Sequence, residues 1–401
     1  MADSPNAELG IYISIPFCRS KCTYCNFASG VYPASEHERY INRLIEDLKS
    51  SADWAAQMGV ELPRQVDSVY LGGGTPSLLA PELVAHLFAA VRSEFQLTAD
   101  AEITVECAPG QIADPTLDAL AAAGVNRVSL GVQSFIDREA ALSGRLHSRD
   151  TTLDDIRRLR SAGIANLSVD LIAGLAEQTF DSWDQSLAVL VDSGVPHASV
   201  YMLEIDEDSR LGREMLSGGA RYHAGLVPND DSIAQMYSVA TERLAAAGLQ
   251  QYEISNFSRP GSASRHNLRY WHRRPYLGLG LDASSMLRTN QAERYVLRST
   301  TTDDLAAFMQ GRQAVETAWL SPARQHEEAW FLGLRLNAGV EIAALEQEFG
   351  ADTVAPALQA VAQLAEDGLL TSDGHSVRLT TRGQLLSNEV FHHFLELETH
   401  A

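Results

Sequence analysis

Short apolar runs alternate with stretches of helical periodicity along the first half of the chain. The apolar run 11–15 predicts a buried strand, which ends at Pro16 because proline cannot donate to a sheet ladder. Between 36 and 58 the apolar residues recur at helical spacing, which predicts an amphipathic helix. The same reasoning predicts strands at 65–71 and 101–106 and helices at 81–95 and 115–123. The chain therefore begins as strand–helix units.

One eight-residue sequence pattern recurs without gaps at 123–130, 162–169 and 193–200, and more weakly at 247–254. Each copy places a glycine where a helix would end and then continues into a strand-like run. Such helix–glycine–strand units favour parallel strands joined by helical crossovers, and their apolar strands fit a sheet that is covered by helices. We therefore predict an α/β fold, an incomplete (β/α) barrel over roughly residues 8–230.

The pattern changes after residue 300, where helices alternate with a short hairpin. The polar turn Asp373-Gly374-His375 separates two strand-like runs. Helix, hairpin and helix resemble a winged-helix unit, although the acidic chain favours a packing domain over DNA binding. Helices are predicted at 303–315, 322–336, 352–367 and 382–397. The predicted domains are a partial barrel at 1–230, an extension at 231–300 and a small C-terminal domain at 301–401.

The composition is that of an acidic globular protein. Of 401 residues, 45% are hydrophobic and 21% are charged, which excludes a disordered or fibrous chain. Lys and Arg number 31 against 52 Asp and Glu, a formal charge of −21, so nucleic acid is not an expected partner. No apolar stretch approaches the length of about 18 residues that a membrane span requires, and the first residues do not resemble an export signal. We expect a cytoplasmic protein with reduced thiols and no integral membrane segment.

Three of the four cysteines fall close together, in the spacing Cys18-x3-Cys22-x2-Cys25. Where thiols stay reduced, this crowding favours metal ligation over disulfides. Tetrahedral zinc requires four ligands, and the remaining Cys107 lies far along the chain. A four-iron cluster usually takes four cysteines, so three would leave one iron open to another ligand. A zinc loop completed by a distant histidine, or three unrelated buried cysteines, are the alternatives.

Polar residues and glycines follow the predicted strands. Gly72–Gly74 ends the second strand, where the missing side chains let a ligand approach the backbone. Glu106, Gln133 and Asp170 lie at the ends of later strands, and Arg145 is available to pair with a carboxylate. Each is often a structural polar group when taken alone. Since α/β barrels build their sites at the carboxyl ends of the strands, we expect these residues to share one rim.

A three-cysteine loop of this spacing, directly after the first strand of a βα barrel, resembles the radical S-adenosylmethionine (SAM) superfamily. The resemblance implies one [4Fe-4S] cluster on Cys18, Cys22 and Cys25. It also implies that the amino and carboxylate groups of SAM chelate the open iron, and that one electron cleaves the sulfonium to a 5′-deoxyadenosyl radical. By the same resemblance, the SAM contacts fall on Tyr12, Tyr24, Gly73, Gly74, Thr75, Glu106, Gln133, Arg145 and Asp170.

The resemblance covers nearly the whole chain and narrows to the oxygen-independent coproporphyrinogen III oxidase-like group. The true oxidase carries a further cysteine two residues after the third cluster ligand, where this chain has Phe27. In this respect the chain is similar to the HemW-type haem chaperones, which bind haem and pass it to haem proteins such as respiratory enzymes. The segments that match the group are 12–18, 71–78, 131–135, 170–175 and 252–257.

Those chaperones also carry a His-Asn-x-x-Tyr-Trp segment, which implies haem binding at His266, Asn267, Tyr270 and Trp271. Imidazole is a common axial ligand of haem, and the two aromatic residues offer flat apolar surface to a macrocycle. A structural histidine in a surface turn is the alternative reading of His266. Four arginines form a basic patch suited to haem propionates: Arg265, Arg269, Arg273 and Arg274.

The chain departs from the group at two points. Ser284 stands where related proteins have the histidine of Gly-Ala-His-Ser, so one contact on the substrate side is absent. The sequence Glu106-Cys107-Ala108-Pro109 replaces Glu-x-Asn-Pro, which leaves Glu106 in place.

The resemblance therefore implies a haem chaperone that binds a [4Fe-4S] cluster, SAM and haem. Its expected partners are haem and haem-receiving clients such as membrane respiratory enzymes, and the sequence leaves a homodimer open. The alternative is SAM-dependent decarboxylation of coproporphyrinogen III. Phe27 disfavours it, because the true oxidase has a cysteine at this position. A third hypothesis is a radical SAM enzyme that acts on a non-porphyrin substrate. Whether SAM is cleaved stays open.

Overall fold

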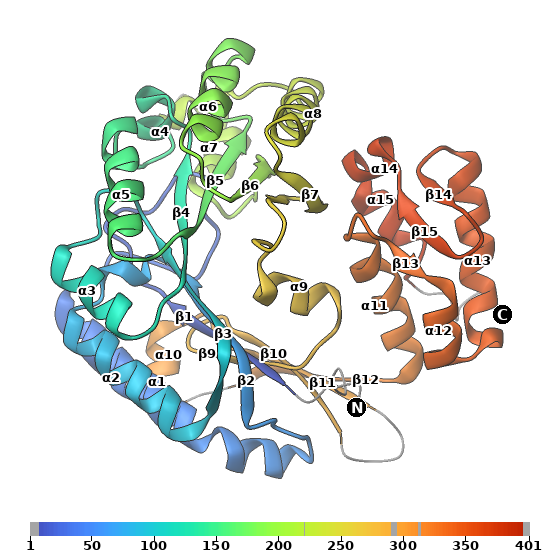
Figure 1. The fold of residues 1–401 in the computed structure, drawn as a ribbon, viewed down its shortest axis with the longest axis horizontal. Coiled ribbons are helices and arrows are strands. Elements are labelled where there is room, and N and C mark those ends of the chain that lie inside the picture. Colours follow the sequence, from blue (N-terminus) through green and yellow to red (C-terminus); the bar gives the residue numbers. More distant parts are fainter. Residues whose placement is uncertain (1–7, 220, 290–294, 312–313, 396–401) are drawn as a thin grey trace.

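A computed structural model describes residues 8–219, 221–289, 295–311 and 314–395. One large sheet organises most of these residues, and a smaller sheet lies in the C-terminal part (Figure 1). The strands of the large sheet are β1 (Leu9–Ile15), β2 (Gln65–Gly73), β3 (Gln96–Cys107), β4 (Arg127–Gln133), β5 (Asn166–Ala173), β6 (His197–Met202), β7 (Gln250–Glu253), β8 (Asn256–Ser258), β9 (Tyr276–Leu279), β10 (Ser284–Arg288), β11 (Val296–Thr301) and β12 (Ala314–Leu320). Their spatial order is β12-β11-β10-β9-β1-β2-β3-β4-β5-β6-β8-β7.

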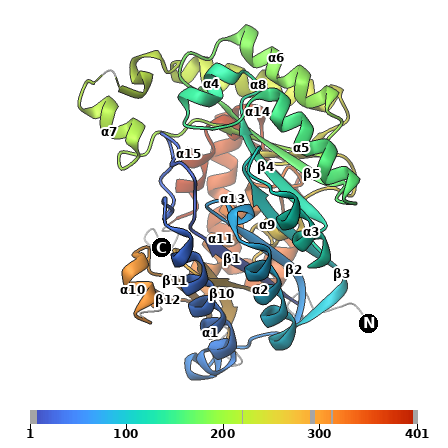
Figure 2. The same ribbon diagram turned by 90° about the vertical axis from the view of Figure 1, so that its left-hand side faces the viewer.

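Strands β1 to β6 are parallel and follow the order of the chain. The helices of their crossovers cover one face of the sheet, and Figure 2 shows several of them in front of the strands. These helices are α1 (Ala34–Met58), α2 (Pro81–Glu94), α3 (Asp114–Ala122), α4 (Asp137–Leu142), α5 (Arg149–Ser161) and α6 (Phe180–Asp192). The sheet ends at β12 and β7 rather than closing on itself, so the predicted incomplete (β/α) barrel is confirmed.

The recurring sequence pattern lies at the turns from helix to strand. Gly124, Gly163 and Gly194 follow α3, α5 and α6 and have φ of +83°, +88° and +66°, the left-handed conformation that ends a helix at little cost for glycine. Gly248, in the weaker copy, has φ +83° after α8 (Asp230–Ala246). The strand after it, β7, pairs with antiparallel β8 rather than with β6. The fourth copy therefore does not extend the parallel order.

Beyond β1 the sheet continues with chain from the last third of the sequence. Strand β9 pairs parallel to β1, and β10, β11 and β12 follow in antiparallel order. The predicted helix 303–315 is wrong over most of its length, since α10 covers only Leu305–Met309 and β12 begins at Ala314. Gly311, with φ +82°, turns the chain between them, while residues 312 and 313 lie outside the described residues. The sheet therefore reaches Leu320, beyond the domain boundary predicted at residue 301.

The C-terminal part has its own sheet and core. Strands β13 (Val340–Glu341), β15 (Ser376–Leu379) and β14 (Leu370–Ser372) pair in that order. Trp330, Val354, Val377 and Phe394 are among its buried core residues. The predicted helix 382–397 is two short helices over its described residues, because Leu386 leaves the helical conformation at φ −112°, while residues 396 and 397 lie outside the described residues. The helices here are α11 (Pro322–Leu334), α12 (Ile342–Phe349), α13 (Ala351–Glu366), α14 (Thr381–Leu385) and α15 (Ser387–His392).

The remaining helices are short apart from α8. They are α7 (Arg210–Leu216), α9 (Arg265–Trp271) and 3-10 turns at Pro76–Leu78 and Arg221–Leu226. Within the described ranges, no helix combines the length and the apolar character that crossing a membrane requires.

Helix α9 packs on the inner face of the sheet, opposite the crossover helices (Figure 1). Ser264 caps its first turn, and the Glu102 carboxylate accepts the backbone N–H groups of Arg265 and His266 at 3.1 Å each. A carboxylate at a helix N-terminus satisfies free donors and complements the helix dipole. Arg269, on the last turn, is buried and forms an ion pair with buried Asp67 of β2. Its Nη1 also donates to the carbonyls of Glu8 and Pro275.

Arg269→Ala should destabilise the protein by about 3–5 kcal/mol, since it leaves the Asp67 carboxylate buried without its closest cation. Arg157→Ala is the control, because its ion pair with Asp154 is exposed on both sides and should add little to stability. Urea unfolding of the two variants measures both effects. Equal losses would show that the buried pair does not anchor α9.

Candidate functional site

A cavity of about 900 Å³ lies at the carboxyl ends of the parallel strands. The cysteine loop between β1 and α1 forms one wall, and the ends of β2 to β6 form its floor. The C-terminal part supplies a further wall through Arg335 of the segment after α11 and through residues 385–389. The residues of the predicted shared rim therefore line one open cavity, to which both halves of the chain contribute.

All three clustered cysteines line this cavity. Backbone hydrogen bonds hold their loop, from the Cys18 N–H to the Gly30 carbonyl and from the Thr23 N–H to the Ser143 carbonyl. Gly144 permits the second contact, because its φ is +94° and a Cβ there would lie 3.1 Å from Cys22 Cα. The loop thus packs directly on the turn after α4.

The three clustered cysteines line one cavity without being gathered as the ligands of one ion among the described residues. Among the described residues, no group of three or more His, Cys, Asp or Glu side chains is placed to hold a single metal ion. Each cysteine of a four-iron cluster binds a different iron, so the ligands need only surround the cluster. The cysteines therefore fit a cluster better than the alternative of one zinc ion.

Cys107 lines the same cavity from the end of β3. Its side chain is buried, and burial raises the pKa of its thiol to about 12. Burial also raises the pKa of the Cys18 thiol, but Cys18 is only half-buried and its Sγ accepts a hydrogen bond from Thr75 Oγ1 at 3.8 Å. The thiolate is the form that binds metals, so Cys107 is a poor fourth ligand.

Two carboxyl groups project from β3 and β5. Glu106 accepts hydrogen bonds from the Tyr70 hydroxyl at 2.8 Å and from the Gly73 N–H at 3.2 Å, yet burial raises its pKa to about 7. Asp170 accepts from the hydroxyls of Ser129 and Ser168 at 3.0 and 3.3 Å, and burial raises its pKa as well. Both carboxyls line the cavity, so a bound cation or hydrogen-bond donor would favour their ionised forms.

Arg145 and Gln133 also line the large cavity. Arg145 Nη2 donates to the Tyr24 hydroxyl at 3.1 Å, and Gly131 leaves room for that guanidinium, which a Cβ would approach to 2.9 Å. Arg145 Nε and Gln133 Oε1 are buried without a hydrogen-bond partner among the described residues. Gln133 has φ +69°, a conformation uncommon outside glycine and frequent at functional sites. These atoms fit a polar ligand that would complete their hydrogen bonds.

Tyr12 is the one residue predicted to contact SAM that does not line the large cavity. It lines a smaller cavity of about 250 Å³ together with Tyr270, Tyr276 and Ser284. Gly73 and Phe27 line both cavities, so the two spaces adjoin. The remaining predicted SAM contacts all line the large cavity: Tyr24, Gly73, Gly74, Thr75, Glu106, Gln133, Arg145 and Asp170.

The four residues predicted to contact haem have different surroundings on α9. His266 is 1% exposed, and its Nδ1 and Nε2 lie 3.0 Å from Ser68 Oγ and 2.9 Å from the Tyr270 hydroxyl. Burial lowers the pKa of His266 to about 3, which keeps the imidazole neutral. Tyr270 lines the smaller cavity, whereas Asn267 and Trp271 line neither cavity. The guanidinium of Arg335 lies over the Trp271 ring, 4.5 Å from its centre.

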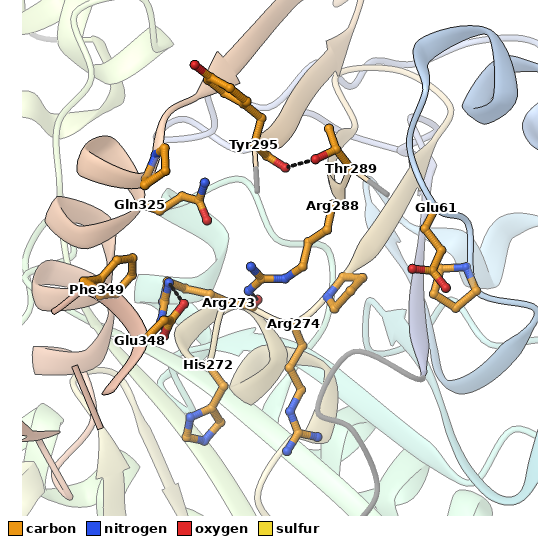
Figure 3. A pocket seen from close by; sticks show the side chains of 13 residues that line it. Glu61, His272, Arg273, Arg274, Arg288, Thr289, Tyr295, Gln325, Glu348 and Phe349 are labelled. Carbon is orange, nitrogen blue, oxygen red and sulfur yellow. Dashed lines mark hydrogen bonds and ion pairs between the residues drawn. The ribbon is translucent and has the colours of Figure 1, made fainter. Parts of the chain in front are cut away.

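The predicted basic patch is divided among separate contacts. Arg265 pairs with Asp100 and also with Asp67, which is the partner of Arg269 as well. Arg273 pairs with Glu348. Arg273 and Arg274 line a third cavity of about 460 Å³ with Arg288 (Figure 3). Carboxylates therefore neutralise much of the patch, because neighbouring elements bring acidic side chains to it.

Sequence reasoning missed the polar residues deeper in the sheet. Ser68 and Tyr70 of β2 and Ser129 and Ser168 of the next strands hydrogen-bond predicted site residues. A signal was available, because polar residues recur at every second position of these strands and so share one face. The apolar residues between them hid this alternation.

Comparison with known proteins identifies the family. Residues 12–190 match the radical SAM superfamily, and residues 320–386 match the HemN C-terminal domain. Heme chaperone HemW of Lactococcus lactis is 32% identical over 395 residues, which cover 98% of both chains. The chain belongs to the HemW family of radical SAM proteins. HemW of Mycobacterium tuberculosis is 34% identical over 97% of this chain and 95% of its own.

Two further relatives extend this comparison. Radical S-adenosyl methionine domain-containing protein 1 of mouse mitochondria is 33% identical over 95% of this chain and 86% of its own. The structure of the coproporphyrinogen III oxidase HemN from Escherichia coli has the same fold as this HemW-family chain, with a TM-score of 0.81. That match is 24% identical in sequence and covers 98% of this chain and 91% of the other.

Replacing Cys18, Cys22 or Cys25 by Ala should abolish cluster assembly, because each removes one of three thiolates around the cavity. Cys107→Ala is the matched control and should bind iron and sulfide as the unchanged protein does. The cluster content of each variant is measured by iron and acid-labile sulfide analysis after anaerobic reconstitution. A cluster lost in Cys107→Ala would mean that Cys107 is a fourth ligand and that no iron is left open.

SAM affinity should rise about tenfold between about pH 6 and about pH 8, because the raised pKa of Glu106, about 7, keeps much of this carboxyl neutral at the lower pH. Only the ionised form gives full acceptor strength to the ligand. Glu106→Gln should bind SAM more weakly and lose this pH dependence. Equilibrium dialysis with the reconstituted protein tests it, and an unchanged slope in the variant would contradict the assignment.

Proposed function

We propose that this protein is a haem chaperone that holds a [4Fe-4S] cluster and SAM and delivers haem to client proteins. The observation that carries the proposal is the large cavity, which is lined by the three cysteines and by Gln133 and Arg145, two residues with a buried polar atom that has no partner among the described residues. The full-length similarity to proteins named heme chaperone HemW supports haem as the cargo. The expected cytoplasmic location, the clients and a homodimer stay predictions.

Different residues of the large cavity would hold the cluster and SAM. Cys18, Cys22 and Cys25 would hold the cluster, which supplies an open iron to SAM and, when reduced, an electron. Glu106 and Asp170 would accept hydrogen bonds from the ligand. Gln133 Oε1 and Arg145 Nε offer the hydrogen bonds that they lack in the protein alone.

The haem is proposed to bind next to this site. Phe27, 61% exposed, lies between the two cavities, and the smaller cavity has aromatic walls from Tyr12, Tyr270 and Tyr276. Flat aromatic and apolar surface suits a macrocycle. Haem held there would adjoin the cluster loop, so cluster occupancy and haem transfer would be coupled through the same segment of chain.

Oxidative decarboxylation of coproporphyrinogen III is the second candidate, favoured by the fold shared with HemN. Phe27 argues against it, because the true oxidase has a cysteine at this position. An anaerobic assay with SAM and a reductant should yield no protoporphyrinogen under conditions in which a true oxidase is active. Product formation would replace the chaperone proposal.

Haem titration into the reconstituted protein should give saturable binding of one haem per chain, followed by transfer to an apo-haem protein. Phe27→Asp, which places a charge on the exposed aromatic surface, should weaken binding by roughly tenfold through the loss of apolar contact. Phe180→Asp is the control, since Phe180 is also exposed but lines neither of these cavities. Negligible binding by the unchanged protein would refute the proposed function.

A further inference from the structure

The third cavity, of about 460 Å³, is lined by residues of the large sheet and of the C-terminal part (Figure 3). Its volume lies within the range of roughly 300–1,000 Å³ that is usual for small-molecule sites. None of its lining residues also lines the large or the smaller cavity, so it is a separate space. Its walls are the segment before β2, the segment after α9, the ends of β10 and β11 that face each other, and helices α11 and α12.

Three arginines line this cavity, in a chain whose formal charge is −21. Glu348 neutralises one of them, since its two oxygens accept hydrogen bonds from Arg273 at 3.1 and 2.6 Å. The Arg273 guanidinium also lies over the Phe349 ring, 5.3 Å from its centre. Arg274 and Arg288 have no ion pair among the described residues. The cavity therefore keeps two cations that the described protein does not pair.

Arg288, the last residue of β10, is the better placed of these two cations. Its Nη2 donates to the Arg273 carbonyl at 3.1 Å, while its Nε is buried without a hydrogen-bond partner among the described residues. Figure 3 shows the Arg288 side chain extending toward Arg273. Burial and the neighbouring Arg273 lower the pKa of Arg288, so its surroundings disfavour the charge. A bound anion would offset both effects.

Glu61 limits what kind of anion can fill the cavity. Its side chain is exposed and has no ion pair among the described residues, and Figure 3 shows it on the side away from Glu348. A carboxylate repels negative charge and accepts hydrogen bonds from hydroxyl groups. A ligand that spans the cavity should therefore carry its negative charge at Arg288 and hydroxyl groups toward Glu61.

A phosphate monoester meets these requirements better than a carboxylate does. Its charge of nearly −2 at neutral pH matches two unpaired arginines, and its three acceptor oxygens suit the fork of a guanidinium. We propose that the third cavity binds a small phosphorylated compound with hydroxyl groups, and that Arg288 holds the phosphate. Arg274 is an exposed cation at the rim and contributes less. This site goes beyond the proposed haem function, whose two cavities share no lining residue with it.

The ligand would touch both the large sheet and the C-terminal part, since β10 and helices α11 and α12 all line the cavity. Binding should therefore strengthen the packing of the C-terminal part on the sheet. The same C-terminal part supplies a wall of the large cavity through Arg335 and residues 385–389. An occupied third cavity would thus hold that wall in place.

Ribose 5-phosphate is the probe, and isothermal titration calorimetry measures its binding to the full chain. The unchanged protein should bind one ribose 5-phosphate per chain. Ribose and succinate should bind at least about tenfold more weakly, because neither carries a phosphate. Saturating ribose 5-phosphate should also raise the midpoint of thermal unfolding, since a ligand that binds only the native state stabilises it.

Variants of the two unpaired arginines test the assignment. Arg288→Gln should weaken binding about tenfold or more, and Arg288→Lys should weaken it less, because lysine keeps the charge and loses the fork. Arg274→Gln should weaken binding roughly twofold to threefold. Arg39→Gln is the matched control, since it removes an exposed positive charge on α1 outside the cavity and should leave affinity unchanged. Circular dichroism confirms that each variant is folded before titration.

Several results would overturn this inference. One is the absence of ribose 5-phosphate binding by the unchanged protein, and another is equal affinity in the folded Arg288→Gln variant. Succinate that binds as tightly as ribose 5-phosphate would make this a carboxylate site instead. Displacement of the probe by haem would assign the arginines to propionates. All four results leave the haem chaperone proposal standing, because only the absence of haem binding refutes that proposal.

Discussion

The alternation of side chains across the parallel strands is the constraint on which this structure depends. Successive residues of a strand point to opposite faces, so the apolar residues of β1 to β6 meet the crossover helices and the polar residues meet the inner face. Polar groups on an inner face must be paired or bind a ligand, since burying them alone is costly. Near the carboxyl ends, Glu106 and Asp170 are partly paired and open to the large cavity. The polar groups that lie deeper in the sheet must be covered by another element of the structure.

Helix α9 provides that cover. Glu102 receives its N-terminal N–H groups, Asp67 pairs with Arg269, and Ser68 bonds His266. The side chains that carry the sequence motif are therefore divided by burial. His266 completes the polar interior, whereas Tyr270 reaches a cavity wall. A motif whose residues are adjacent in sequence can thus serve both stability and ligand binding, because a helix turns its residues toward different surroundings.

The fold and much of the large cavity could be predicted from local signals. Glycines such as Gly124 and Gly163 end a helix with a positive φ, and they therefore indicate where the following strand begins. Parallel strands then bring residues such as Glu106 and Asp170 to one edge, whatever the details of packing. The basic patch could not be assessed in this way. Carboxylates from distant segments neutralise this patch. Asp67, for example, pairs with Arg269, which lies 202 residues further along the chain.

The sequence by itself determined the cysteine loop, the order of the parallel strands and the family, because these depend on residues close together in the chain or on a repeated pattern. Only the tertiary structure decided that Cys107 joins the cavity with a buried thiol, that Tyr12 belongs to the smaller cavity, and that His266 is enclosed. The physical reason is that burial and hydrogen-bond partners are supplied by distant segments. A residue type and its spacing indicate what chemistry is available, whereas the surrounding fold decides which lone pairs and protons remain free to perform it.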